Sequence, residues 1–243
     1  MSKAGNYVVS GAGSGIGRAV ALRLLNQGHS VFGLGRDARK LEAVSREAPG
    51  FAFASVDLSG NSQAHVAKIR GWLGSRKLLG LVNNAGVFDR LPFLETSDEI
   101  WDRQFQNCLM SAVRLTRALY PELKAAGGAA VVNVSSTLGI RPVASTAAYS
   151  AMKAAMLNWS GTLALEWAKD RIRVNCVCPG VVDTPIHAFH GPGDQTEDRV
   201  RAHAMQPLGR MGRPEDIAES VSLLLDQEWT TGAVLSVDGG IGL

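Results

Sequence analysis

Cysteine is scarce in this sequence, and the cysteines present are not spaced for a disulfide framework or a metal site. Cys108, Cys176 and Cys178 stand in short apolar contexts, and the last two form C-x-C rather than a spaced metal pair. We therefore expect buried, reduced thiols. The histidines are dispersed, and although His187 and His190 in "HAFH" are close enough to chelate a metal, we interpret them as part of a flexible substrate-side loop.

Blocks of like charge and long apolar runs are also missing. The 25 basic and 22 acidic residues are scattered, so the net charge of +3 offers no patch that would follow a nucleic-acid backbone. No apolar run reaches the roughly 18 residues of a membrane span. The opening residues MSKAGNYVVSG lead directly into an apolar run without the features of a signal peptide. We expect a cytoplasmic protein with neither nucleic acid nor membrane as a partner.

What the sequence does contain is a regular alternation of strand-like and helix-like segments. Helical apolar spacing marks residues 17–28 and 147–170, for example. Alternation of this kind predicts an α/β fold with a doubly wound parallel sheet. No repeat or linker divides the chain, so we treat residues 1–243 as a single domain. The seven expected strands lie within residues 7–11, 30–35, 51–57, 78–84, 129–136, 172–180 and 233–240.

One long segment after the sixth expected strand breaks the alternation. Residues 181–200 lack a strand or helix pattern and include a cluster of Pro and Gly. Ligands bind open α/β sheets at the carboxyl ends of the strands, and long loops at that edge are often lids. We therefore expect a substrate loop around residues 183–207 rather than a disordered surface insertion.

A glycine-rich turn joins the first expected strand to the first expected helix. Gly11, Gly15 and Gly17 allow a tight turn and a close backbone approach, and the free N–H groups at a helix start suit a pyrophosphate. The spacing G-x-x-x-G-x-G differs from the G-x-G-x-x-G dinucleotide fingerprint. Since a plain turn also needs glycine, the motif alone indicates phosphate binding only moderately.

Polar residues follow the third and fourth expected strands. Asp57 ends the third, and Asn83, Asn84 and Gly86 in "NNAG" end the fourth. Singly, each is best explained as a helix cap or turn former. Together, because parallel strands end at one edge, we expect them to line one crevice.

Tyr149 and Lys153 stand four residues apart in "AYSAMKAAM", on one face of a predicted helix. By itself this pair is most simply read as core filling, because both side chains can cover apolar surface and keep a polar tip wet.

The order of these motifs along the whole chain resembles the short-chain dehydrogenase/reductase family. Ser10 stands where the family usually has Thr, which keeps a hydroxyl. The resemblance implies a Rossmann-type fold and hydride transfer between a nicotinamide cofactor and a carbonyl compound or secondary alcohol. The motifs that carry it are the three glycines of the turn, "NNAG" at 83–86, Ser136 thirteen residues before Tyr149, Lys153, "PG" at 179–180 and the terminal "TGAVLSVDGG".

The resemblance also implies which residues form the site. The catalytic set it implies is Asn107, Ser136, Tyr149 and Lys153, with Ser136 selected over Ser135 by spacing and by strand alternation. The cofactor-binding set it implies, beyond Tyr149 and Lys153, is Gly11, Ser14, Gly15, Ile16, Gly17, Arg36, Asp57, Leu58, Asn84, Gly86, Pro179, Gly180, Val182 and Thr184. No metal is expected, and Leu138, Val143 and Phe189 suggest a mixed apolar substrate pocket.

Chemistry explains why a phenol and an ammonium are needed together. Tyr149 can give a proton to a carbonyl oxygen or take one from an alcohol, but a free Tyr has a pKa near ~10. An ammonium about 4 Å away would stabilise the phenolate by at most roughly 4 kcal/mol, which corresponds to a fall of roughly 3 units in the pKa of Tyr149. We therefore predict that Lys153 lowers the pKa of Tyr149, with desolvation of the phenolate acting in the opposite direction, while Ser136 hydrogen-bonds the substrate oxygen.

The end of the second expected strand bears on the choice between NADP(H) and NAD(H). NAD-preferring relatives usually carry an acid at the strand's last position, where this chain has Gly35, and Arg36 then matches the basic residue of NADP-preferring relatives. Against this, Asp37 lies about 20 residues beyond Gly17, at the generic acid position, although it also suits a helix N-cap. We favour NADP(H) and leave NAD(H) open.

Three further expectations complete the sequence interpretation. The resemblance and the apolar C-terminal segment predict a homo-oligomer, most often a tetramer. A non-catalytic dinucleotide-binding regulator on the same fold is the main rival function. A methyltransferase-like or epimerase-like enzyme is disfavoured, because the first has no use for Y-x-x-x-K and the second usually adds a larger substrate domain.

Overall fold

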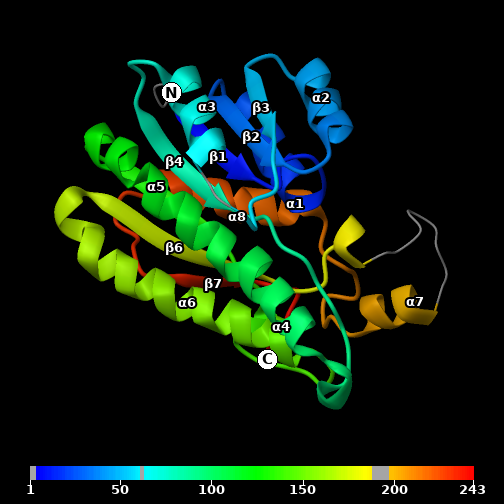
Figure 1. Cartoon of the computed structure of the whole chain (residues 1–243). Helices are drawn as coiled ribbons and strands as arrows, with labels where there is room; N and C mark the ends of the chain where they lie inside the picture. Colours follow the sequence, from blue (N-terminus) through cyan, green and yellow to red (C-terminus); the bar gives the residue numbers. More distant parts are fainter. Residues whose placement is uncertain (1–3, 61–62, 188–196) are drawn as a thin grey trace.

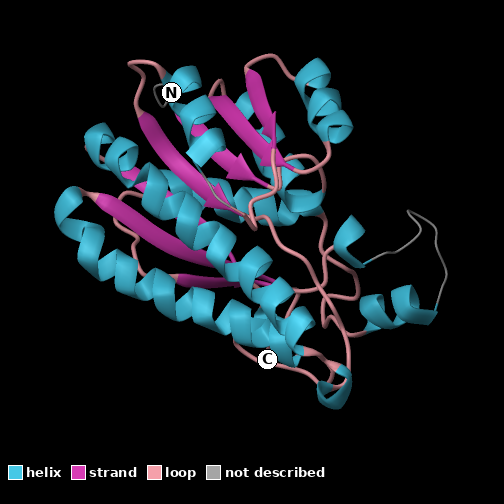
Figure 2. Ribbon diagram, in the orientation of Figure 1, coloured by secondary structure: helices cyan, strands magenta, loops and turns pink. Residues whose placement is uncertain are grey.

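A parallel sheet runs through the centre of the chain in the computed structural model, which describes residues 4–60, 63–187 and 197–243 (Figures 1 and 2). Its seven strands follow the order β3-β2-β1-β4-β5-β6-β7, and every neighbouring pair is parallel. The doubly wound, seven-stranded sheet predicted from the sequence is confirmed. The strands are β1(Asn6–Ser10), β2(Ser30–Gly35), β3(Phe51–Ser55), β4(Leu78–Asn83), β5(Ala129–Val134), β6(Ile172–Pro179) and β7(Val234–Val237).

Helices cover both faces of the sheet. One face carries α3, α5 and α6, and the other carries α1, α2 and α8, as Figure 1 shows. The α-helices are α1(Gly15–Asn26), α2(Ala38–Glu47), α3(Gln63–Leu73), α4(Asp98–Gln104), α5(Ser111–Ala126), α6(Ala147–Trp167), α7(Glu197–Ala204) and α8(Pro214–Asp226). Short helical turns are η1(Phe93–Glu95), η3(Thr137–Gly139), η4(Ala168–Asp170) and η5(Pro185–His187), and a wider π-helical turn, η2(Phe105–Met110), joins α4 to α5.

Two apolar clusters, one on each face, hold the helices against the sheet. Successive side chains of a strand point to opposite faces, so Val9 packs with α1, α2 and α8 while Val8 packs with α3 and α5. Every residue of β5 is buried. A sheet covered on both faces produces continuous apolar strands of this kind.

The segment predicted to be irregular is partly helical. Residues 185–187 form η5, and α7 begins at Glu197, inside the stretch read as loop. Arg199 explains the helix: it is buried and binds the Asp183 carboxylate through two hydrogen bonds of 3.0 and 2.6 Å, so the start of α7 is fixed to the chain after β6. Phe189 and His190 lie outside the described residues. No helix within the described ranges is long and apolar enough to cross a membrane.

Candidate active site

The glycine turn after β1 leaves no room for side chains. Gly11 and Gly15 have φ angles of +69° and +52°, a region that favours glycine. A Cβ on Gly17 would lie 2.3 Å from the Gly11 carbonyl oxygen and 2.5 Å from Asn84 Nδ2. The turn therefore brings backbone, and the N-terminus of α1, directly to the edge of the sheet, as the motif predicted.

Ser10 ties this turn to the end of β4. Its Oγ accepts hydrogen bonds from the backbone N–H groups of Asn84 at 2.9 Å and Ala85 at 3.1 Å, and Asn84 Nδ2 donates to the Ser10 carbonyl at 3.1 Å. The Ser10 hydroxyl makes this link, so the extra methyl group of the Thr that relatives usually have here is not needed for it.

Asn83, in contrast, does not line the crevice. It is buried, and its Nδ2 donates to Thr116 Oγ1 and to Asn133 Oδ1, both at 2.8 Å. The prediction that Asn83 and Asn84 both border the crevice is wrong for Asn83, because adjacent residues at the strand end point to opposite sides. Asn83 joins β4 to β5 and α5 instead.

A cavity of about 460 Å³ lies at the carboxyl ends of the strands. A cavity of this size suits a cofactor or small ligand, since such sites span roughly 300–1,000 Å³. The predicted residues that line it are Gly11, Ser14, Gly15, Ile16, Arg36, Asp57, Leu58, Asn84, Gly86, Asn107 and Thr184.

Four predicted cofactor residues stand behind this lining. Gly17 lies under the turn, and the Val182 side chain is buried in the core. Pro179 ends β6, and a Cβ on Gly180 would lie 2.8 Å from the Asp238 carbonyl oxygen. These residues shape the backbone around the cavity rather than its surface.

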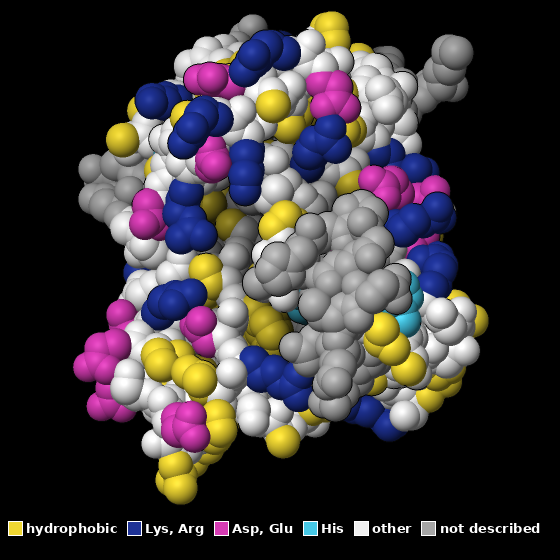
Figure 3. All heavy atoms as spheres, turned by 90° about the vertical axis from the view of Figure 1, so that its right-hand side faces the viewer, with side chains coloured by type: hydrophobic (Ala, Val, Ile, Leu, Met, Phe, Trp, Pro, Cys, Tyr) yellow, Lys and Arg dark blue, Asp and Glu magenta, His cyan; other side chains and the backbone are white. Residues whose placement is uncertain are grey.

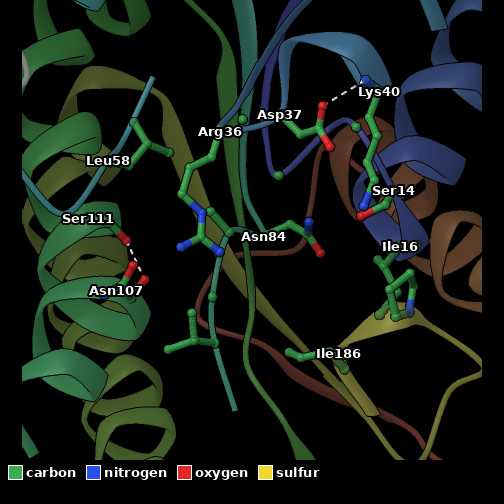
Figure 4. A pocket seen from close by; sticks show the side chains of 18 of the residues that line it. Ser14, Ile16, Arg36, Asp37, Lys40, Leu58, Asn84, Asn107, Ser111 and Ile186 are labelled. Atoms are coloured by element: carbon green, nitrogen blue, oxygen red, sulfur yellow. Dashed lines mark hydrogen bonds between the residues drawn. The ribbon is translucent and has the colours of Figure 1, made fainter. Parts of the chain in front are cut away.

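Two cationic side chains that follow β2, those of Arg36 and Lys40, line the cavity. The strand ends at Gly35, as predicted, and Arg36 reaches inward from it (Figure 4). Asp37 caps α2, its carboxylate accepting the Lys40 backbone N–H at 3.2 Å, and Lys40 also lines the cavity. Lys40, in the first turn of α2, was not predicted from the sequence. Lys and Arg side chains gather on the upper half of this face of the molecule (Figure 3).

Asp57 is held in its ionised form at the same edge. Its Oδ1 accepts hydrogen bonds from Ser59 N at 2.9 Å and Ser59 Oγ at 2.7 Å, and these bonds lower the pKa of the carboxyl group. Asp57 thus offers the cavity a fixed acceptor.

Tyr149, Lys153 and Ser136 meet where α6 crosses the end of β5. Tyr149 and Lys153 are buried, and Lys153 Nζ donates to the Val134 carbonyl oxygen at 2.8 Å. Ser136 Oγ accepts the Leu138 N–H at 3.1 Å, and Ser135 Oγ turns the other way and donates to the Lys153 carbonyl at 2.9 Å. The alternation that selected Ser136 over Ser135 is therefore present.

The predicted fall in the pKa of Tyr149 is wrong for this structure. Burial raises the pKa of Tyr149, and a hydrogen bond with Ser136 only partly opposes it. Burial likewise lowers the pKa of Lys153. The Lys153 ammonium bonds to the Val134 carbonyl oxygen and lies 5.6 Å from the centre of the Tyr149 ring, and burial of the phenol has the larger effect on its pKa.

Asn107 sits in the π-helical turn η2 and faces the cavity beside Ser111 (Figure 4). Its Nδ2 donates to the Arg103 carbonyl at 2.9 Å, and its own carbonyl accepts Ser111 Oγ at 2.7 Å. Ser111 and Arg103 also line the cavity and were missed, although Ser111 lies one helical turn from Asn107.

Apolar side chains surround the Tyr149 ring. Buried Val87 and Cys108 pack on it, with Phe88, Leu138 and Met152 beside them. The prediction of an apolar surrounding is confirmed for Leu138, while Val143 is 46% exposed. All three cysteines are free and buried, as expected.

Comparisons with known proteins agree with this geometry. Residues 11–242 match the protein-family model described as Enoyl-(Acyl carrier protein) reductase. The chain is 36% identical over 244 residues to a 4-formylbenzenesulfonate dehydrogenase of Comamonas testosteroni, covering 96% of each chain.

Two solved structures share the fold. The first is a 3-ketoacyl-(acyl-carrier-protein) reductase from Brucella melitensis complexed with NADH, with a TM-score of 0.89, 29% identity and 98% of both chains covered. The second is an L-sorbose reductase from Gluconobacter frateurii complexed with NADPH and L-sorbose, with a TM-score of 0.89 and 29% identity. That match covers 98% of this chain and 96% of the other.

Proposed function

Because the chain belongs to the short-chain dehydrogenase/reductase family, we propose that Tyr149 is the proton donor and acceptor of an NADP(H)-dependent carbonyl reductase. The protein is an oxidoreductase that uses a nicotinamide cofactor and acts on small carbonyl compounds or alcohols. The observation that carries the proposal for Tyr149 is its position: a buried phenol beside Ser136 and Lys153, at the end of the sheet that holds the cavity.

The residues around the cavity fit a dinucleotide. Gly17 is held so close to Gly11 and Asn84 that no side chain fits, which leaves the N-terminus of α1 open to a pyrophosphate. The bound nicotinamide supplies the hydride in reduction and accepts it in oxidation. The remaining steps belong to side chains of this chain.

Proton transfer is assigned to Tyr149 and its neighbours. Ser136 Oγ holds the substrate oxygen, and the Tyr149 phenol gives that oxygen a proton during reduction or takes one during oxidation. Lys153, fixed by the Val134 carbonyl, places a positive charge beside the phenol ring and favours the phenolate when it forms. We assign Asn107 and Ser111 to the cavity wall opposite Arg36.

A preference for NADP(H) is supported by the cations at the end of β2. Arg36 and Lys40 both line the cavity there, and a guanidinium suits a phosphate group. Asp37, the residue that would favour NAD(H), also lines the cavity, but its Oδ1 caps α2. A ribose 2′-phosphate would therefore meet positive charge.

We also propose a cytoplasmic homotetramer. Exposed apolar side chains near the C-terminus support assembly: Trp229 is fully exposed, Leu243 is 93% exposed, and Val234 of β7 is 47% exposed. Three free, buried thiols suit a reducing compartment. Light scattering at micromolar concentration should give a tetramer mass, and a monomer mass would contradict this proposal.

Deuteride transfer tests the proposed function. NADPH carrying deuterium at its transferable position is incubated with the protein and a panel of ketones, and the product alcohols are analysed by mass spectrometry. Deuterated alcohol supports catalysis. Tight NADPH binding without transfer to any carbonyl would favour the non-catalytic regulator. The relatives named above act on an aromatic sulfonate, an acyl thioester and a sugar, so the panel includes all three classes.

A further inference from the structure

Phe88 lies beside Tyr149 and has no role in the proposed proton transfer. Its ring meets the Tyr149 ring edge-on, with centroids 4.8 Å apart and planes at 77°. On its other side it meets the His187 ring at 5.9 Å and 68°. Three segments far apart in the sequence, the β4 to α4 connection, α6 and η5, therefore meet at one ring.

The backbone on both sides of Phe88 is held by the α4 and η2 segment. Cys108 Sγ lies 3.5 Å from the Val87 nitrogen and 3.1 Å from the Val87 carbonyl oxygen, within hydrogen-bond distance of both. The Asp89 carboxylate accepts Gln104 Nε2 at 2.7 Å and pairs with Arg103 at 3.2 Å. With both neighbours fixed, the freedom that remains to Phe88 lies in its side-chain torsions.

The Phe88 ring borders the cavity and contacts the Tyr149 ring. Among the described residues, the cavity is lined by Phe88 and Val87 but not by Tyr149 or Ser136. Tyr149 is only 8% exposed. A substrate whose carbonyl oxygen meets the Tyr149 phenol from the cavity would therefore lie against the Phe88 ring.

The side chains packed around Tyr149 and Phe88 are mostly apolar. Val87, Leu138 and Met152 surround Tyr149, and burial lowers the pKa of His187, which keeps its ring neutral. Hydroxyl groups of a polyhydroxylated substrate would lose hydrogen bonds to water that Val87, Leu138 and Met152 do not replace. An apolar ring would pack against these side chains and against the Phe88 ring.

We propose that Phe88 is a specificity-determining residue, and that it selects ketones and alcohols with an apolar ring at the carbonyl over polyhydroxylated ones. The inference rests on the proposed function, since it assumes that Tyr149 meets the substrate oxygen. It goes further by naming the substrate class.

The first test compares cyclohexanone with erythrulose, a small polyhydroxylated ketone, as substrates with NADPH. We expect kcat/KM to favour cyclohexanone by roughly 100-fold, the scale of discrimination in an apolar pocket. If neither is reduced, both are measured as competitive inhibitors of whichever carbonyl the enzyme does reduce, and the ratio of inhibition constants should show the same order. A ratio near one, or in favour of erythrulose, overturns the inference and leaves the proposed function intact. Absence of any reducible carbonyl overturns both.

The second test changes the ring itself. Phe88→Ala should lower the cyclohexanone to erythrulose ratio at least tenfold, mainly by raising KM for cyclohexanone, whereas Phe88→Leu should keep most of it. Phe93→Ala is the matched control, because Phe93 is 65% exposed on the same connection and lines no part of the cavity.

A pH profile separates this role from a loss of folding. Removing the Phe88 ring exposes Tyr149, so the apparent pKa for alcohol oxidation should fall in Phe88→Ala and stay unchanged in Phe93→Ala. An unchanged substrate ratio in a folded Phe88→Ala variant would refute the assignment of Phe88.

Discussion

The Lys153 ammonium nitrogen lies 5.6 Å from the centre of the Tyr149 ring and donates to the Val134 carbonyl oxygen. The ammonium is thus fixed by the backbone at the end of β5 and faces the ring. Its position beside a phenol whose pKa is raised by burial gives the active site a defined direction of pH dependence.

Reduction and oxidation should respond differently to pH. Because the raised pKa keeps the Tyr149 phenol protonated through neutral and mildly alkaline pH, ketone reduction should vary little there. Alcohol oxidation needs the phenolate, so its kcat/KM should rise as pH increases. Initial rates in both directions, at saturating cofactor, measure this. A reduction rate that falls tenfold between neutral and mildly alkaline pH would contradict the assignment.

Ser10→Ala should destabilise the fold by about 2 kcal/mol, since two part-buried N–H groups, of Asn84 and Ala85, lose their acceptor. Ser10→Thr should stay close to the parent because the hydroxyl is retained. Urea unfolding gives the free energies. Ser14→Ala is a matched control, as the Ser14 side chain makes no capping hydrogen bond; equal losses in the two Ala variants would argue against the link.

Gly17→Ala should impair both folding and NADPH binding. The added Cβ would lie 2.3 Å from the Gly11 carbonyl oxygen, so the turn must shift, at about 1–3 kcal/mol. Gly71→Ala is the comparison: Gly71 lies in α3 with nothing within 4 Å of an added Cβ, and Ala there should stabilise the helix by about 0.5–1 kcal/mol. NADPH affinity retained in Gly17→Ala would count against the phosphate site.

Arg36→Ala should remove most of the preference for NADP(H). A charge-assisted hydrogen bond contributes about 1.5–3 kcal/mol, so the parent should prefer NADP(H) by roughly 10- to 150-fold in kcat/KM. Lys40→Ala should reduce the preference by a smaller factor. Arg39→Ala serves as control, because Arg39 is exposed on α2 and does not line the cavity. Equal or better efficiency of the parent protein with NAD(H) would show that the cations do not select the cofactor.

The sequence predicted the sheet and the order of the motifs because both depend on local patterns. Apolar runs gave the strands, and Gly11, Gly15 and Gly17 marked a turn whose φ angles require glycine. The side-chain environment depends on tertiary contacts and could not be read in this way. The pKa of Tyr149 was predicted in the wrong direction because its burial comes from Phe88 and Leu138, which the sequence does not place beside it.

Two residues that line the cavity, Lys40 and Ser111, were not predicted from the sequence. Lys40 enters the cavity because α2 begins immediately after Asp37, and Ser111 does so because η2 continues into α5 without a break. Ser111 lies four residues from Asn107, a spacing that places side chains on one helix face, whereas Arg36 precedes the N-cap of α2 and shares no helix face with Lys40. No spacing in the sequence indicated that the side chains of Asn83 and Asn133 would hydrogen-bond to each other in the interior.

The central claim is that Tyr149 transfers the proton, and Tyr149→Phe tests it most directly. The ring and its apolar contacts remain, while the hydroxyl beside Ser136 is removed. The measurement is kcat for ketone reduction by the parent and the variant, with NADPH affinity determined by fluorescence titration on the same preparations. We predict that kcat falls at least about 10²-fold while NADPH affinity stays within a few-fold of the parent. A kcat within a few-fold of the parent would show that the proton comes from another group.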